Sequence, residues 1–223
     1  MVVILVIAMI AVALTIDYVL SRRNATLEAP AQAEVREPRP APLAHVVGGF
    51  RLMDGFRYHP GHTWAVAETP ELVRVGLDDF AARLTGKIAS LALPSRGQWI
   101  RQGQRVLAVA GDGREYTLVS PVEGAVVDVN EKALAEPDSI RNDPYGEGWL
   151  LKVNSPDFRT TARNLLSGAL ARRWMEEAAD RLRGMRPAPV AVTSLDGGVA
   201  MEDLSAELSE DAKKNIGREF FLE

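Results

Sequence analysis

The sequence predicts a mainly β domain with short helices, preceded by one transmembrane helix and followed by a C-terminal helical extension. Three features predict this class. An unbroken apolar run opens the chain, short runs rich in β-branched residues between turn residues fill its middle, and apolar residues at helical spacing follow. The predicted bounds are 1–21 for the transmembrane helix, 22–47 for a proline-rich cytoplasmic linker, 48–158 for the β domain, 159–186 for an amphipathic helix and 187–223 for the extension.

Composition limits the function classes. The 223 residues are 47% hydrophobic and 25% charged, with a net charge of -4, which suits one domain of ordinary size with appendages. The acidic balance argues against nucleic-acid binding, because phosphate recognition needs a concentrated field of Lys and Arg. The absence of cysteine excludes disulfides, thiol nucleophiles and cysteine-ligated zinc or iron–sulfur centres in this chain.

The first segment has the length and polarity of a membrane anchor. Residues 1–16 are an uninterrupted apolar run, and 17–20 extend it before Arg22 and Arg23, so a helix here spans about 30 Å. The alternatives are a buried core helix and a cleaved signal peptide, but a signal peptide begins with a basic region, which this run lacks. Because the arginines follow the run, we expect a single pass through the inner (cytoplasmic) membrane, with the N-terminus outside and the C-terminal domain cytoplasmic.

The linker and the β domain differ sharply in composition. Several prolines and alternating Glu and Arg occupy 24–47, where almost no large apolar residue occurs, so we expect an extended linker that holds the domain near the membrane. In the domain, 62–68 and 72–77 are β-rich runs around Thr-Pro-Glu and predict a hairpin. Residues 77–86 have helical spacing and end on glycine, which predicts a short capped helix.

A second β unit follows the short helix. Residues 87–93 predict a strand that Pro94 stops, and a strand from Val106 enters a hairpin around the turn Gly111-Asp112-Gly113-Arg114. The segment 124–129 repeats, weakly, the pattern of 86–91. Two such units packed face to face would bury the apolar sides of both.

The C-terminal third predicts helices and an interaction surface. From Thr161 to Met185, apolar residues recur at steps of three and four: Leu165, Leu166, Leu170, Trp174, Ala178 and Leu182. We expect this amphipathic helix to cover an open side of the β domain or to bind a partner. The last 23 residues predict one or two short helices, and their final apolar residues either fold back or insert into another subunit. Candidate partner contacts are therefore Trp174, Phe220, Phe221 and Leu222.

An ordered set of short motifs carries a family resemblance. The motifs are His62-Thr63-Trp64, Val75 to Ala81, Leu93-Pro94, Ser120 to Gly124, and Asn142 to Leu150 with the sequence NDPYGEGWL. From about residue 58 to residue 158 the chain resembles the glycine cleavage H-protein. The resemblance implies a lipoyl-like barrel-sandwich fold with short helices, and a lysine at a hairpin tip, seven residues before the serine of the Ser-Pro pair, that carries lipoic acid.

This chain lacks a lysine where the resemblance implies one. Seven residues before Ser120 stands Gly113, and no lysine occurs between Lys87 and Lys132. The neighbours of Gly113 are Asp112 and Arg114, and a guanidinium stays protonated and cannot form the amide. We therefore predict a degenerate lipoylation site and no bound cofactor.

Other candidate sites are weak. The pair His59 and His62 offers two imidazoles, but a metal site needs three or four ligands and an oriented second shell, so we predict no metal site. Asp78 and Asp79 point about 100° apart on a helix and indicate helix N-terminal charge rather than acid–base chemistry. We find no catalytic residues and no evident small-molecule substrate, and predict that the chain is not an enzyme.

Three functional hypotheses follow. The first is a non-catalytic, membrane-tethered H-protein-like domain that serves as a structural or docking subunit among integral membrane proteins; a redox or energy-conserving complex is a host suggested by analogy. The second is a lipoylated acyl or aminomethyl carrier of the glycine cleavage type, modified at another lysine: Lys87, Lys132 or Lys152. The third is an adaptor that binds the glycine cleavage partners without carrying the intermediate.

Overall fold

The computed structural model describes residues 43–185 and 208–222. The predicted transmembrane helix, with Arg22 and Arg23, lies outside these residues, as does the linker up to residue 42. In the two described ranges, no helix is both long and apolar enough to cross a membrane. The described residues belong to one compact unit, which spans Pro42–Glu223.

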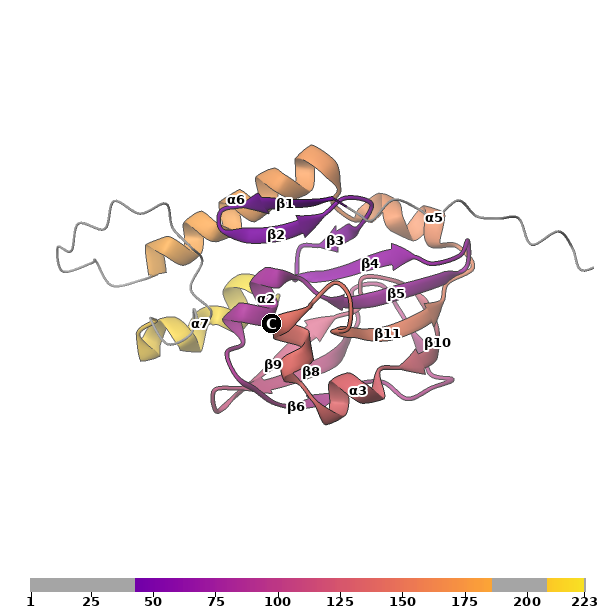
Figure 1. The fold of residues 1–223 in the computed structure, drawn as a ribbon, viewed down its shortest axis with the longest axis horizontal. Coiled ribbons are helices and arrows are strands. Elements are labelled where there is room, and N and C mark those ends of the chain that lie inside the picture. Colours follow the sequence, from indigo (N-terminus) through magenta and orange to yellow (C-terminus); the bar gives the residue numbers. More distant parts are fainter. Residues whose placement is uncertain (1–42, 186–207, 223) are drawn as a thin grey trace, which may run out of the picture. The chain divides into compact units, whose positions relative to one another are not determined.

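The unit is mainly β with short helices (Figure 1). Its strands are β1 (Ala44–Val47), β2 (Phe50–Met53), β3 (Arg57–His59), β4 (Thr63–Ala67), β5 (Leu72–Leu77), β6 (Ile88–Ala92), β7 (Trp99–Ile100), β8 (Arg105–Gly111), β9 (Arg114–Val119), β10 (Gly124–Val129) and β11 (Trp149–Asn154). Its helices are α2 (Asp79–Leu84), α3 (Glu131–Ala135), α4 (Asp138–Asn142), α5 (Phe158–Thr161), the 3-10 helix η1 (Ala162–Asn164), α6 (Gly168–Met185) and α7 (Glu210–Phe220).

The strands form three sheets, and all of their pairings are antiparallel. The largest has the order β3-β4-β5-β11-β10-β7, a second has the order β6-β8-β9, and β1 pairs with β2 alone. The predicted hairpin of 62–68 and 72–77 is confirmed as β4–β5, with Thr63 opposite Leu77. The weakly repeated segments become β6 and β10, which lie in different sheets.

Two predicted boundaries differ from the structure. Strand β1 begins at Ala44, inside the range predicted as linker, because the glycine turn after Val47 lets this short segment pair with β2. The predicted amphipathic helix does not run from Thr161: α6 begins at Gly168, after a break in which Leu166 exchanges backbone hydrogen bonds with Tyr58. Leu166 is thus tied to β3, and Leu170, which has helical spacing, is 62% exposed.

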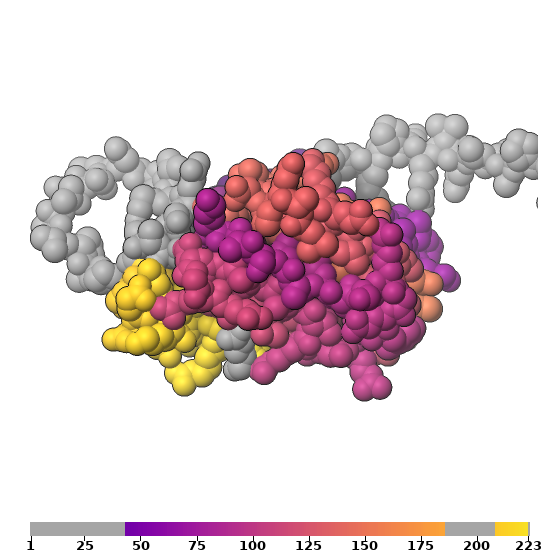
Figure 2. Space-filling view, turned by 90° about the horizontal axis from the view of Figure 1, so that it is seen from below, coloured from indigo at the N-terminus to yellow at the C-terminus, as the bar shows by residue number. Residues whose placement is uncertain are grey.

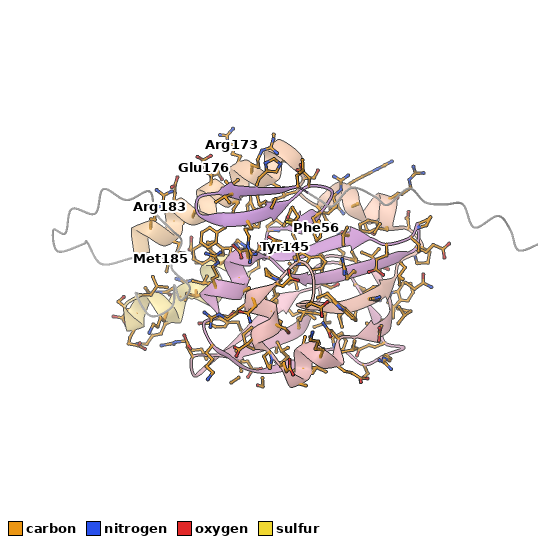
Figure 3. All side chains as sticks on the ribbon, in the orientation of Figure 1. Phe56, Tyr145, Arg173, Glu176, Arg183 and Met185 are labelled. Atoms are coloured by element: carbon orange, nitrogen blue, oxygen red, sulfur yellow. The ribbon has the colours of Figure 1, made fainter. Side chains whose placement is uncertain are left out.

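Helix α6 lies along the β1–β2 hairpin (Figure 1). Its buried stripe comprises Ala171, Met175, Ala178, Ala179 and Leu182. Figure 3 shows Arg173, Glu176 and Arg183 on the side of α6 that faces away from the strands. The helix therefore covers one side of the β domain with the amphipathic pattern that the sequence predicts.

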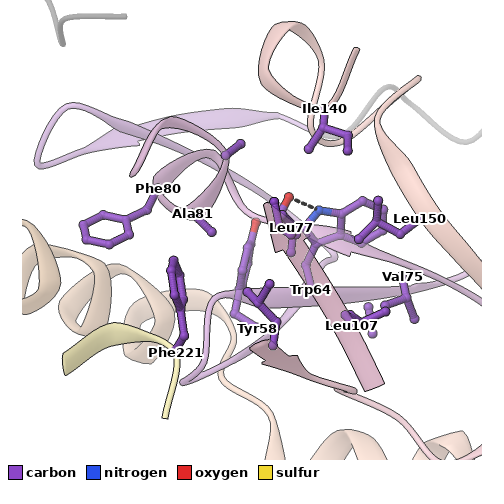
Figure 4. Packing of buried hydrophobic residues seen from close by; sticks show 14 of the residues in the cluster. Tyr58, Trp64, Val75, Leu77, Phe80, Ala81, Leu107, Ile140, Leu150 and Phe221 are labelled. Atoms are coloured by element: carbon purple, nitrogen blue, oxygen red, sulfur yellow. Dashed lines mark hydrogen bonds between the residues drawn. The ribbon is translucent and has the colours of Figure 1, made fainter. Parts of the chain in front are cut away.

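The core is rich in aromatic side chains. Trp64 is fully buried, and its Nε1 donates to the backbone oxygen of Leu77 at 2.6 Å (Figure 4). Phe56 packs edge-on against Trp64 and against Tyr145, at centroid distances of 5.0 Å and 5.4 Å (Figure 3). The Tyr145 hydroxyl donates to the Arg51 carbonyl oxygen at 2.6 Å, and burial raises the pKa of this phenol well above its usual value.

Candidate functional site: the β8–β9 hairpin and the His62 cluster

The tip of the β8–β9 hairpin is a two-residue turn. Asp112 and Gly113 both have positive φ, 49° and 75°, and Gly111 pairs with Arg114 across the turn. Two consecutive left-handed residues are the geometry of a tight hairpin turn, which favours Asp-Gly. A Cβ at Gly113 would meet nothing within 4 Å, so the tip is open. The side chains at the tip are the carboxylate of Asp112 and the guanidinium of Arg114.

Lys87 lies beside this tip. Its backbone N–H donates to Asp112 Oδ1 at 3.1 Å, and its carbonyl oxygen accepts from the Asp112 N–H at 3.3 Å. Lys87 is exposed and directly precedes β6. The backbone of Lys87, 25 residues upstream of Asp112 in the sequence, is therefore held next to the hairpin turn.

The other two candidate lysines lie on regular elements. Lys132 is on α3 and pairs with Glu147 at 2.8 Å, and this hydrogen bond raises the pKa of the Lys132 amine. Lys152 is on β11, 3.4 Å from Glu68 Oε2 and 5.2 Å above the Trp149 ring. Neither is held at the hairpin tip by the backbone contacts that Lys87 makes.

His62 stands at the centre of a second cluster. It is fully buried in left-handed backbone conformation, with φ of 60°, and its Nδ1 lies 2.8 Å from Asp78 Oδ2. Because an ionised carboxylate only accepts, Nδ1 donates to Asp78. Nε2 has no hydrogen-bond partner among the described residues. The imidazole stacks on Phe80 at 4.3 Å and lies 4.6 Å from the Trp174 ring.

The C-terminal segment closes this cluster. Phe220 and Phe221 are buried, with ring centroids 6.1 Å and 6.3 Å from that of His62. Phe220 packs on Phe80 at 5.0 Å, and Phe221 packs on Tyr116 of β9 at 5.3 Å. Figure 2 shows α7, in yellow, lying against the body of the molecule.

Two polar contacts join the same segment to the hairpin strands. Arg114 donates to Glu210 Oε2 at 2.7 Å, and Arg105 donates to the Leu222 carbonyl oxygen at 2.5 Å. Of the predicted partner contacts, Trp174, Phe220 and Phe221 thus pack within their own chain, while Leu222 is 47% exposed. The final apolar residues fold back, which is one of the two expected outcomes.

The two histidines do not form a ligand pair. His59 Nδ1 accepts from the Gly61 N–H at 3.1 Å, whereas His62 binds Asp78. No group of three or more potential metal-ligating side chains occurs in the described part of the chain. Asp78 and Asp79 also act separately: Asp78 caps α2 through the Ala81 N–H, and Asp79 binds Arg51 and Arg83.

His59 predicts a pH dependence of stability. Burial, and then the nearby His62, lower the pKa of His59 below its usual value. The unfolded chain therefore binds more protons than the folded chain between the two pKa values, and stability falls as pH drops through about 6.5. We expect urea unfolding midpoints to decrease from pH 7.5 to pH 5.5, and to decrease less in His59→Gln. An equal decrease in both proteins would show that His59 is not responsible.

Two features of this site could not be predicted from the sequence: the contact between Lys87 and Asp112, and the left-handed backbone of His62. Nothing in the sequence pairs Lys87 with Asp112, since the contact depends on how β6 aligns with β8. The left-handed backbone of His62 is likewise invisible in a His-Thr-Trp motif. The signal that could have suggested the buried cluster is the Phe-Phe-Leu terminus, because such residues need an apolar surface.

Comparisons with known proteins agree with this architecture. The family model described as "Glycine cleavage H-protein" matches residues 56–178, more than half of the chain. A probable glycine cleavage system H protein of Aeropyrum pernix is 36% identical over 108 residues, which cover 48% of this chain and 75% of that protein. The glycine cleavage system H protein of Coprothermobacter proteolyticus is also 36% identical over 108 residues, covering 48% of this chain and 85% of its own length.

A solved structure has the same family name. The crystal structure of a glycine cleavage system H protein from Mycobacterium marinum is 29% identical, with a TM-score of 0.45, and the match covers 47% of this chain and 86% of that one. The family model spans β3 to β11, including the β8–β9 hairpin, and the first part of α6. On these matches, the chain belongs to the glycine cleavage H-protein family.

Proposed function

We propose that this chain is a non-catalytic member of the family that acts as a docking subunit of a membrane protein complex. The observation that carries the proposal is the β8–β9 tip, which has the geometry of a projecting hairpin but offers no amine: Gly113 stands where the family resemblance implies the lipoyl lysine. The proposed tether is the apolar segment 1–21, with its C-terminal arginines on the cytoplasmic side. A redox or energy-conserving complex is the proposed host, by analogy.

The C-terminal segment supports a role other than carrying a swinging group. Arg114, Tyr116 and Arg105 of the hairpin strands are all engaged by residues 210–222. A carrier needs its hairpin free to visit several enzymes, whereas this hairpin already has a partner within the chain. The proposal therefore treats the domain as a protein-binding module.

Native mass spectrometry of the chain, gently extracted from its own membranes, tests this function. We expect a defined complex containing an unmodified chain that retains residues 1–21. The partner masses would identify the host. A lone monomer under extraction conditions that preserve other membrane complexes would contradict the docking role.

A single lysine at the tip should not restore lipoylation. Gly113 has φ of 75°, a left-handed conformation that disfavours lysine, and the flanking Asp112 and Arg114 replace the family's pattern. We expect Gly113→Lys, co-expressed with a lipoyl ligase and lipoate, to keep its unmodified intact mass. The host's own H protein serves as the positive control. A lipoyl-sized mass increment on the variant would show this prediction to be wrong.

One observation favours a second candidate, a carrier modified at Lys87. The Lys87 backbone exchanges two hydrogen bonds with Asp112, so this exposed residue is anchored beside the hairpin turn. If this candidate is correct, the wild-type chain carries a lipoyl-sized increment that Lys87→Arg removes, while Lys132→Arg keeps it. An unmodified wild-type chain from cells with active lipoylation would rule out this candidate.

A further inference from the structure

The surface beneath α7 has an arginine at each end of the helix. Arg114 meets the acidic first turn of the helix at Glu210, and Arg105 meets the carbonyl oxygen of Leu222 after its last turn. The last turn of the helix contacts two aromatic rings of the body: Phe220 packs on Phe80, and Phe221 packs on Tyr116. We call Arg105, Arg114, Tyr116, Phe80 and His62 the α7-docking face. This face fits an amphipathic helix with an acidic first turn and aromatic residues at its end.

Helix α7 contacts this face through side chains and is far from α6 in the sequence. It belongs to none of the three sheets, so it shares no strand ladder with the body, and 24 residues, 186–209, separate it from the end of α6 in the sequence. The acidic side chains of its ion pairs are well exposed: Glu210 is 71% exposed, and Glu219, 3.8 Å from Arg181, is 43% exposed. Exposed pairs of this kind add little stability, so the aromatic contacts of the last turn provide most of the attachment.

The tail is also an imperfect occupant. His62 Nε2 is buried and has no partner among the described residues, and a phenyl ring can neither donate nor accept a conventional hydrogen bond to it. His62 also has a left-handed backbone conformation, which costs free energy in a residue other than glycine. A helix that placed a tyrosine hydroxyl or an indole N–H here would satisfy the nitrogen that Phe220 and Phe221 leave unpaired.

We propose that residues 208–222 form a displaceable lid, and that the α7-docking face binds a helix of a partner protein in place of this lid. The partner helix is amphipathic, with an acidic first turn and aromatic residues in its last turn. This inference rests on the proposed docking function and names the surface that the docking uses. The lid keeps the aromatic cluster covered until a partner helix replaces it.

A labelled peptide of residues 208–223 tests the lid without knowledge of the partner. In the wild-type full-length chain, the tethered tail competes at an effective concentration of about 1 mM, so added peptide binds poorly. In the double variant Phe220→Ala, Phe221→Ala the tail is weakened, and we expect at least tenfold tighter binding by fluorescence anisotropy. Leu170→Ala, which truncates a 62% exposed leucine on α6, is the matched control and should bind like the wild type.

Hydrogen exchange of the wild-type chain provides the second measurement, which holds even where the double variant fails to fold. We expect the amides of α7 to exchange through an opening that leaves β8 and β9 protected. If α7 exchanged only together with these strands, the lid proposal would be wrong. It would also be wrong if the double variant folded but bound the peptide no better than the wild type. Because both measurements use this chain alone, they can succeed even if native mass spectrometry finds no complex.

Discussion

Replacing Trp64 with alanine is expected to lower the stability of the domain by about 3–5 kcal/mol, the usual range for a buried Trp or Phe truncated in a core. Trp64 is fully buried, and its Nε1 donates to the carbonyl oxygens of Leu77 and Pro144 at 2.6 Å and 3.2 Å. The indole also lies directly over Gly76, where an added Cβ would come within 2.5 Å of its Cζ2 atom. The substitution therefore leaves a cavity that the rigid strand β5 cannot fill.

Thermal unfolding followed by circular dichroism measures this effect. For a domain of this size, a loss of a few kcal/mol lowers the Tm by roughly 10 °C. Trp99→Ala is the matched control, because Trp99 lies on β7 with 53% of its surface exposed, and it should change stability by less than about 0.5 kcal/mol. Equal Tm values for Trp64→Ala and the wild type would mean that the core is not organised around this indole.

The same tryptophan shows what could be predicted from the sequence. The His-Thr-Trp motif and the β-rich runs on either side of it predicted the β4–β5 hairpin, because local alternation is enough to define two adjacent strands. The short capped helix was predicted for a similar reason: the signals of α2 lie within ten residues. Elements defined by nearby residues could therefore be predicted from the sequence.

Features that depend on distant parts of the chain could not be predicted from the sequence. The break before α6 arises from the pairing of Leu166 with Tyr58, more than a hundred residues apart, which overrides a helical pattern that is continuous in the sequence. The docking of Phe221 on Tyr116 joins residues that are equally remote. The candidate site was thus only partly predictable: the sequence shows that no lysine occurs between Lys87 and Lys132, while the His62 cluster is produced by tertiary packing.

Asp78 links that cluster to the helix beside it, and its removal is the second large effect that we expect. One carboxylate oxygen accepts a hydrogen bond from His62 Nδ1 at 2.8 Å, and the other caps α2 by accepting from the Ala81 N–H at 2.8 Å. Loss of a helix cap costs about 1 kcal/mol, and a buried polar group left without its partner costs about 1–3 kcal/mol. We therefore expect Asp78→Ala to destabilise the domain by about 3 kcal/mol, as measured by urea unfolding.

A second substitution separates the two roles of this carboxylate. The asparagine of Asp78→Asn has one acceptor oxygen instead of two. This oxygen can cap α2 or accept from His62, but it cannot replace both carboxylate oxygens. We therefore expect a loss of stability between those of the wild type and Asp78→Ala. Asp128→Ala, which removes a surface partner of Arg96, is the control for the loss of an aspartate and should change stability by less than about 1 kcal/mol. If Asp78→Ala were no more destabilising than Asp128→Ala, the buried contact between His62 and Asp78 would contribute nothing to the fold. The orientation of the His62 ring, and with it the position of the unpaired Nε2 beneath α7, would then not depend on the hydrogen bond to Asp78.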